Sequence, residues 1–229
     1  MRQVKKKGRK DKKTAPNPRS EVIKRRVEKL CDELNKRNIE GIFVESSSDA
    51  CRKIKKMIPK GATVALGGSV TIVESGIIDT LRQMDINLLD RYREDISKKE
   101  VDKMRREGLM ADVFVSSTNA ITMKGELINA DGIGNRIASM IYGPQKVIIV
   151  CGINKIVKNI QEGVERIYLT AGPMNSLRFN ADAPCAETGF CKEDICYPPQ
   201  RICNMFSIIE GQAESGRMSV IIVNEILGF

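Results

Sequence analysis

The stretch Ala62-Thr63-Val64-Ala65-Leu66-Gly67-Gly68-Ser69-Val70-Thr71 decides the fold class of this chain. Five residues suited to a buried strand run directly into two glycines and a serine, and Thr71 and Glu74 then form a capping-box pair. A strand that enters a helix through a glycine turn is typical of the βαβ unit, in which helices join parallel strands. The stretch therefore predicts a parallel sheet covered by helices.

Strand-like and helix-like segments alternate on both sides of this stretch. Short apolar runs predict strands at residues 41–44, 86–89, 112–116, 146–151, 166–169 and 220–223. Amphipathic or capped segments predict helices at residues 20–38, 48–57, 97–109, 135–141 and 156–164, and Lys124-Gly125 predicts a hairpin between residues 119 and 130. We therefore predict an α/β fold with a mostly parallel sheet that helices cover on both faces.

The basic charge is concentrated at the start of the chain. The net charge is +9, and residues 1–19 hold nine basic and one acidic side chain, which leaves 29 basic and 28 acidic side chains for residues 20–229. We interpret residues 1–19 as a flexible basic tail and residues 20–229 as one α/β domain. Because the body is nearly neutral and has few aromatic residues, nucleic-acid binding is the weaker interpretation of the tail.

The apolar segments are all short. None approaches the roughly 18 residues of a membrane-spanning helix. The basic start is not followed by the apolar region of a secretory signal. We therefore predict a cytoplasmic protein without a membrane span. A homo-oligomer is possible.

The chain contains no histidine. Imidazole is the commonest general base near neutral pH and the commonest metal ligand, so histidine-dependent catalytic triads and histidine-containing zinc sites are excluded. Catalysis would have to use carboxylates, lysine, cysteine, tyrosine or backbone dipoles. We assign no catalytic residue from the sequence.

Three turns are candidates for a ligand site, because ligands of open α/β sheets bind beyond the carboxyl ends of the strands. The first is Gly67-Gly68-Ser69, where small residues and the start of a helix suit an anion. Its alternative is a tight turn with an N-cap. Another is Asn154-Lys155, which follows the most apolar strand, and its alternative is that Asn154 caps the next helix.

The remaining turn is Asn129-Ala130-Asp131-Gly132-Ile133-Gly134-Asn135-Arg136, which is dense in polar groups. Arg136 offers a forked donor to a phosphate or carboxylate, and Asp131 an acceptor or base, with Asn129 and Asn135 beside them. The alternative is a hairpin exit stabilised by Asx turns, in which Arg136 pairs with a carboxylate. If the three turns meet at one rim of the sheet, they would bind a small anionic metabolite.

The seven cysteines fall into two groups. Three lie in regular elements and are expected in the core: Cys31, Cys51 and Cys151. The other four lie in an irregular loop at about residues 184–204: Cys185, Cys191, Cys196 and Cys203. Without histidine, a metal site there would have to be all-sulfur, with an iron–sulfur cluster as first choice and zinc as second. The spacing matches no standard motif, so free thiols or a redox-sensitive disulfide stay open as alternatives.

Several of these segments resemble the lactate-utilisation (LUD, YkgG- or LutC-like) domain family. The resemblance lies in residues 67–69, 125–138, 142–150 and 152–157, and it extends over most of the chain from about Ser20. It implies a three-layer αβα, Rossmann-like fold of the ribose-phosphate isomerase, glucosamine-phosphate deaminase and CoA-transferase superfamily. It also implies a role in oxidising lactate to pyruvate together with iron–sulfur partner proteins. Relatives with a segment similar to Arg201-Ile202-Cys203-Asn204 are suspected cluster binders.

Two functions remain in competition at this stage. The first is a LUD-type protein of carbon or redox metabolism that binds a small carboxylate or phosphate at the three turns. Under this hypothesis, Arg136→Ala should abolish the protection that a ligand gives against thermal unfolding. The alternative is an accessory or electron-transfer subunit that holds an iron–sulfur or zinc site in the cysteine loop and catalyses nothing itself.

Overall fold

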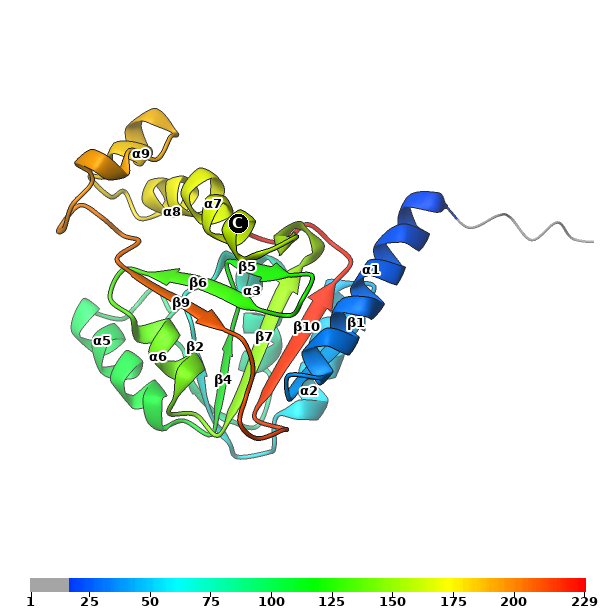
Figure 1. Cartoon of the computed structure of the whole chain (residues 1–229). Coiled ribbons are helices and arrows are strands. Elements are labelled where there is room, and N and C mark those ends of the chain that lie inside the picture. The colour runs from blue at the N-terminus through cyan, green and yellow to red at the C-terminus, as the bar shows by residue number, and fades with distance from the viewer. Residues whose placement is uncertain (1–16) are drawn as a thin grey trace, which may run out of the picture.

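The computed structural model describes residues 17–229 and contains two sheets. The central sheet has six parallel strands in the order β1-β10-β7-β4-β2-β3. Along the chain these strands are β1 (Ile39–Val44), β2 (Thr63–Leu66), β3 (Asn87–Leu89), β4 (Val113–Ser116), β7 (Lys146–Gly152) and β10 (Met218–Val223). The predicted parallel sheet is confirmed, and because all neighbouring strands are parallel their carboxyl ends lie at one edge, as Figure 1 shows for β4, β7 and β10.

A smaller sheet of four strands packs across one face of the central sheet (Figure 1). Its order is β8-β5-β6-β9, made of β5 (Ala120–Thr122), β6 (Leu127–Asp131), β8 (Ile156–Val157) and β9 (Met205–Ile209). The antiparallel pair β5–β6 is the predicted hairpin, and Gly125 in its turn has φ +88°. The sequence analysis did not predict β8 or β9.

Helices complete the three-layer αβα arrangement (Figure 1). One apolar cluster packs α2 (Ser47–Met57), α3 (Val70–Glu74) and α4 (Ile77–Arg82) on one face of the central sheet. A second cluster packs α1 (Pro18–Asn35), α6 (Asn135–Ile141) and the smaller sheet on the other face. The remaining helices are α5 (Lys98–Glu107), α7 (Ile160–Arg166), α8 (Gly172–Arg178) and α9 (Pro184–Thr188). Burial on both faces explains why the central strands are almost continuously apolar.

Helix starts follow the capping rules, with one correction. The Ser97–Glu100 capping box is present as predicted, with both reciprocal hydrogen bonds. The predicted box of Thr71 and Glu74 is wrong, because the Ser69 side chain accepts from Ile72 N and is the N-cap of α3. Thr71 is instead fully buried in the first turn.

The segment from residue 156 to 171 differs most from its prediction. Residues 156–157 form β8 and the helix begins only at Ile160, after the Asn159 cap. The predicted strand at residues 166–169 is wrong, because residues Ile167–Ala171 continue α7 as a π-helix. Ile167 is buried in a small cluster with Ala120 and Ile128, so packing against the smaller sheet overrides the β propensity of these residues.

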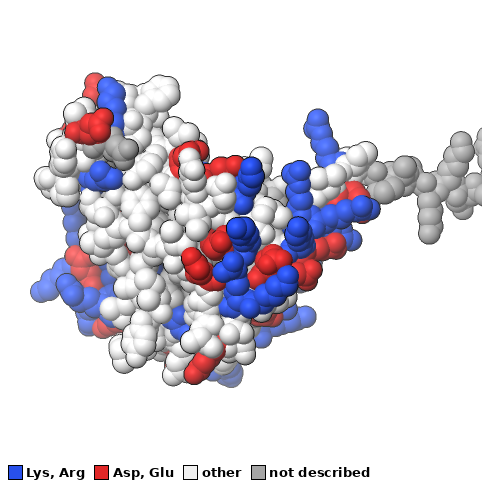
Figure 2. Space-filling view, viewed as in Figure 1, with Lys and Arg blue, Asp and Glu red and all other residues white. Residues whose placement is uncertain are grey.

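The charged tail lies outside the described residues, except for its last residues. Asn17 caps α1 and Pro18 is its first residue, so the helix begins slightly before the predicted residue 20. Figure 2 shows lysine and arginine side chains interspersed with acidic ones along α1, and a largely uncharged surface over β6 and β9. Within residues 17–229, no helix combines the length and hydropathy needed to cross a bilayer.

Gly152, at the end of β7, has no side chain, so the segment of residues 225–227 can cross closely over this glycine. A Cβ there would lie 2.5 Å from the Glu225 carbonyl oxygen and 2.7 Å from Leu227 N, both backbone atoms. We expect Gly152→Ala to lower the free energy of unfolding by about 1–3 kcal/mol, because the crossing segment must move. Denaturant unfolding measures this loss, and a change within about 0.5 kcal/mol would contradict the close approach.

Candidate functional site

A cavity of about 300 Å³ lies between the carboxyl ends of the central strands and the α7–α8 arm. Ser69 comes from the turn after β2, Arg136 from α6, and Lys155 from the 3₁₀ turn after β7, and all three line this cavity. The prediction that three separately encoded turns meet at one rim is therefore confirmed. Gly68, Asp131 and Asn135 also line the cavity.

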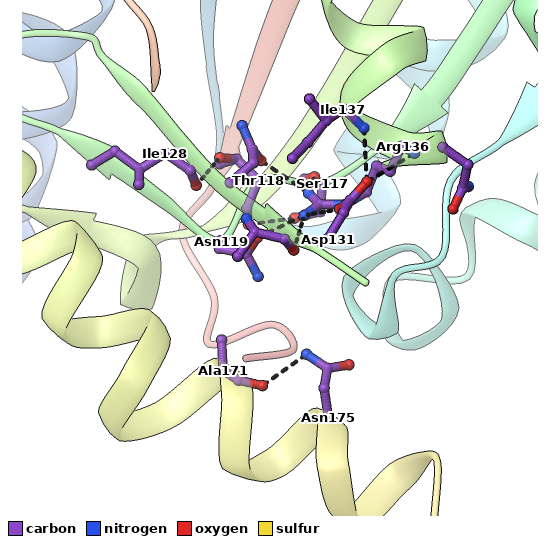
Figure 3. Close-up of polar contacts among 12 residues, drawn as sticks. Ser117, Thr118, Asn119, Ile128, Asp131, Arg136, Ile137, Ala171 and Asn175 are labelled. Atoms are coloured by element: carbon purple, nitrogen blue, oxygen red, sulfur yellow. Dashed lines mark hydrogen bonds and ion pairs between the residues drawn. The ribbon is translucent and has the colours of Figure 1, made fainter. Parts of the chain in front are cut away.

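Arg136 uses all its side-chain N–H groups within the protein (Figure 3). Nε donates to Asp131 Oδ1 at 2.9 Å, and the two terminal nitrogens donate to four further oxygens: Ser117 O, Asn129 Oδ1, Asn119 Oδ1 and Ala130 O. The side chain is only 9% exposed. The alternative in which Arg136 pairs with a carboxylate is therefore the arrangement present, and a direct contact with a ligand stays a prediction.

The Asp131 carboxylate is likewise fully engaged in hydrogen bonds within the protein. Its Oδ2 accepts from the backbone N–H groups of Arg136 and Ile137, both at 2.9 Å, and so satisfies two unpaired donors at the start of α6. Asn129 is fully buried and accepts from Arg136, although its Nδ2 has no hydrogen-bond partner among the described residues. These residues shape the wall of the cavity from within.

Three predicted residues do not line the cavity: Gly67, Asn129 and Asn154. Asn154 neither caps a helix nor lines the cavity, and its amide donates to Gly228 O and accepts from Leu227 N. It therefore fastens the segment after β10 over the carboxyl end of β7.

The Gly67-Gly68-Ser69 turn is held by Tyr92. The Tyr92 hydroxyl accepts from Ser69 N at 2.7 Å and donates to Gly67 O at 2.8 Å. Gly67 N in turn donates to Val115 O. The tight-turn alternative is thus present, and what the turn offers the cavity is mainly room for close approach at Gly68.

Lys155 is a buried cation that forms no ion pair with a carboxylate of residues 17–229. Its Nζ donates to Thr71 Oγ1 at 2.8 Å, Ser117 Oγ at 3.0 Å and Thr118 O at 3.1 Å, so all three ammonium protons have neutral acceptors. Burial lowers its pKa to about 7, and the positive charges of Arg166 and Arg136 act in the same direction. Lys155 can therefore exchange a proton near neutral pH at the edge of the cavity.

Three arginines that the sequence analysis missed also line the cavity: Arg91, Arg105 and Arg178. Burial lowers the pKa of Arg91, and the charges of Arg105 and Arg178 lower it further, which places the three guanidinium groups within electrostatic reach. Arg91 forms no ion pair within the described residues. Arg105 pairs with Asp102, and its Nε is buried without a hydrogen-bond partner there.

The far wall of the cavity comes from the π-helix and α8. Ile167, Ala171 and Asn175 line it, and Asn175 Oδ1 accepts from Arg178 at 2.8 Å. Figure 3 shows Asn175 on this helix, across from the Asp131–Arg136 cluster. The Arg178 guanidinium also lies 4.1 Å from the centre of the Phe179 ring. Single-turn π-helices are frequent at functional sites, and this one was hidden by its β-like composition.

The four loop cysteines lie together, next to this cavity. A second, much smaller cavity is lined by Cys185, Cys191, Cys196 and Cys203. All seven cysteines lie within the described residues and none forms a disulfide. Across residues 17–229, no three Cys, Asp or Glu side chains are grouped closely enough to hold a metal ion as they stand.

These features define a LUD-type α/β protein, and the comparison with family profiles agrees. The LUD domain family matches residues 27–223. The chain therefore belongs to the LUD domain family, a family associated with lactate utilisation. This confirms the resemblance seen in the sequence. No curated protein matches the sequence.

Solved structures resemble the chain only distantly. A DUF162 family protein from Deinococcus radiodurans has a TM-score of 0.47 and 16% identity, over 91% of this chain and 100% of that one. The delta and beta subunits of eIF2B from Chaetomium thermophilum each have a TM-score of 0.34, at 19% and 17% identity. Their matches cover 52% and 63% of this chain, and half of each subunit.

Proposed function

We propose that the chain binds a small anionic metabolite, a carboxylate or a phosphate, in the cavity beyond the carboxyl ends of β2, β4 and β7. The proposal fits a family associated with lactate utilisation, so L-lactate and pyruvate are the first ligands to test. Phosphate esters form the second group, because guanidinium groups bind phosphate and carboxylate oxygens in the same forked geometry.

One observation carries this proposal: the cavity holds an excess of positive charge. Arg91, Arg105, Arg178 and Lys155 line it, and among the described residues only Arg105 of these four forms an ion pair, with Asp102. Asp131, a carboxylate in its wall, is fully engaged with Arg136 and the start of α6. Clustered cations destabilise one another when no anion separates them. An anionic ligand would supply the missing charge.

Arg91 offers the sharpest test. Its guanidinium lies above Gly68, with Nη1 3.6 Å from where a Cβ would stand, and it forms no ion pair that its loss would disrupt. We expect Arg91→Gln to weaken ligand affinity about tenfold, since a charge-assisted hydrogen bond contributes about 1.5–3 kcal/mol. Calorimetric titration with sulfate, phosphate, lactate, pyruvate, sugar phosphates and CoA esters would measure it.

The matched control is Arg93→Gln. Arg93 lies two residues away on the same loop, pairs with Asp95 and does not line the cavity, so the affinity should stay unchanged. If none of these anions binds the wild-type protein, or if the two variants bind equally well, the proposal is wrong.

A second candidate is an accessory role beside iron–sulfur partner proteins of a lactate-oxidising complex. The observation that favours it is the gathering of four cysteines at one small cavity. Copurification with redox proteins, without turnover by the isolated chain, would favour this candidate over an enzyme.

A further inference from the structure

The cysteine loop brings four thiols around one small space. Its cavity measures about 10 Å³, roughly the room of a single water molecule. The four thiols come from α9, from the irregular stretch after it, and from the segment that leads into β9. Residues spread over the loop in sequence are thus gathered at one place by its folding.

Hydrogen bonds fix the backbone of the segment that carries these thiols. Arg201 donates from Nε to Cys203 O at 3.1 Å and from Nη1 to Cys196 O at 3.4 Å. Cys185 Sγ lies 3.2 Å from the Ser176 hydroxyl of α8. One arginine therefore holds two of the cysteines in register, and α8 holds a third.

Little else explains the order of this segment. Its apolar cluster consists of Ala183, Cys185 and Cys196, with Ala181 packed against it. Its regular structure amounts to the five residues of α9 and a three-residue 3₁₀ turn. A segment with so small a core gains most from a cross-link such as a metal ion.

The charges around the cavity suit thiolates bound to a metal. A bound cation deprotonates coordinating thiols outright. Arg201 and Lys192 line the same cavity and would offset the negative charge of a four-thiolate site.

We propose that the loop forms a four-thiolate metal centre with the ligands Cys185, Cys191, Cys196 and Cys203. It would share Ile202 and Cys203 with the wall of the anion cavity, because both residues line both cavities. Four cysteine thiolates suit a single tetrahedral ion such as Zn²⁺. Since no three described ligands converge as they stand, binding requires the thiols to turn into the cavity.

The test begins with the full-length chain isolated without oxygen. Elemental analysis and assay of acid-labile sulfide should find about one zinc ion per chain, or iron with sulfide if a cluster forms instead. The metal should shield the four loop cysteines from alkylation, as mapped by mass spectrometry, and removal of the metal by a chelator should expose them. This readout uses the wild-type chain and needs no variant to fold.

Cys196→Ser should lower the metal content at least about tenfold, because a hydroxyl replaces a thiolate ligand. The matched control is Cys51→Ser, which lies far from the loop in sequence, does not line the small cavity and can still donate to Ser75 O. The proposal is overturned if anaerobic protein, also after reconstitution with zinc, holds neither metal, or if Cys196→Ser retains the full amount. A disulfide between loop cysteines in that protein would likewise contradict it.

Discussion

Replacing Arg136 with alanine is expected to lower the free energy of unfolding by about 3–5 kcal/mol. The substitution removes five hydrogen bonds from the cavity wall and leaves the Asp131 carboxylate, which is 7% exposed, without its cationic partner. An uncompensated buried charge costs far more than a lost surface contact. Equilibrium denaturation in urea would measure the loss.

The comparison variant is Arg25→Ala, which removes an exposed ion pair with Glu21 on α1. Exposed pairs contribute little, so its free energy of unfolding should change by at most about 1 kcal/mol. If Arg25→Ala and Arg136→Ala lower the free energy of unfolding equally, the hydrogen-bond network around Arg136 contributes no more to stability than an exposed ion pair. Arg136→Ala is expected to destabilise the fold, so the absence of a ligand-induced thermal shift in this variant would not by itself show that Arg136 contacts the ligand. The Arg91→Gln variant must therefore be measured beside it.

The second expected result concerns pH. Sulfate affinity should fall about tenfold to a hundredfold between pH 6 and pH 9, because Lys155, with a pKa of about 7, loses its positive charge in that interval. The sign follows from the lowered pKa: below pH 7 the ammonium is present and attracts the anion, and above it the neutral amine does not. Sulfate is the chosen probe because its own charge is constant over this range.

Cys151, whose charge would act on Lys155, does not change its charge in this interval. Burial raises the pKa of Cys151 to about 12, so this thiol stays neutral between pH 6 and pH 9. Lys155→Met should therefore flatten the pH profile, whereas the exposed Lys158→Met should leave it intact. If the pH profiles of sulfate affinity have equal slopes in both variants, Lys155 is not the group that causes the pH dependence. Circular dichroism would show whether each variant is folded.

Much of the architecture could be predicted from local sequence. The strand at β7 is a continuous apolar run and the Ser97–Glu100 pair is a capping box, and both signals act over a few residues. The π-helix at Ile167–Ala171 could not be predicted in this way. Its residues favour strands, and only burial of Ile167 against the smaller sheet makes them helical.

The candidate site shows the same division. Two of the predicted turns follow β2 and β7, parallel strands of the central sheet whose carboxyl ends lie at one edge. The turn that carries Arg136 follows β6 of the smaller, mostly antiparallel sheet, so only the packing of the two sheets brings it to this edge. Arg91, Arg105 and Arg178 escaped notice, because in the sequence each is one more charged residue on a loop or helix surface. Their significance depends on facing a common cavity, which no local pattern encodes.

The sequence alone thus determined the parallel α/β sheet and the meeting of the turns after β2 and β7, because hydrophobic periodicity and glycine-bearing turns act locally. Its motifs carried the resemblance to the LUD family. Only the tertiary structure decided that Arg136 and Asp131 satisfy each other, that Lys155 is buried without an ion pair among the described residues, and that four cysteines share one small cavity. Charge pairing and burial depend on which distant segments pack together, and a linear pattern does not contain that information.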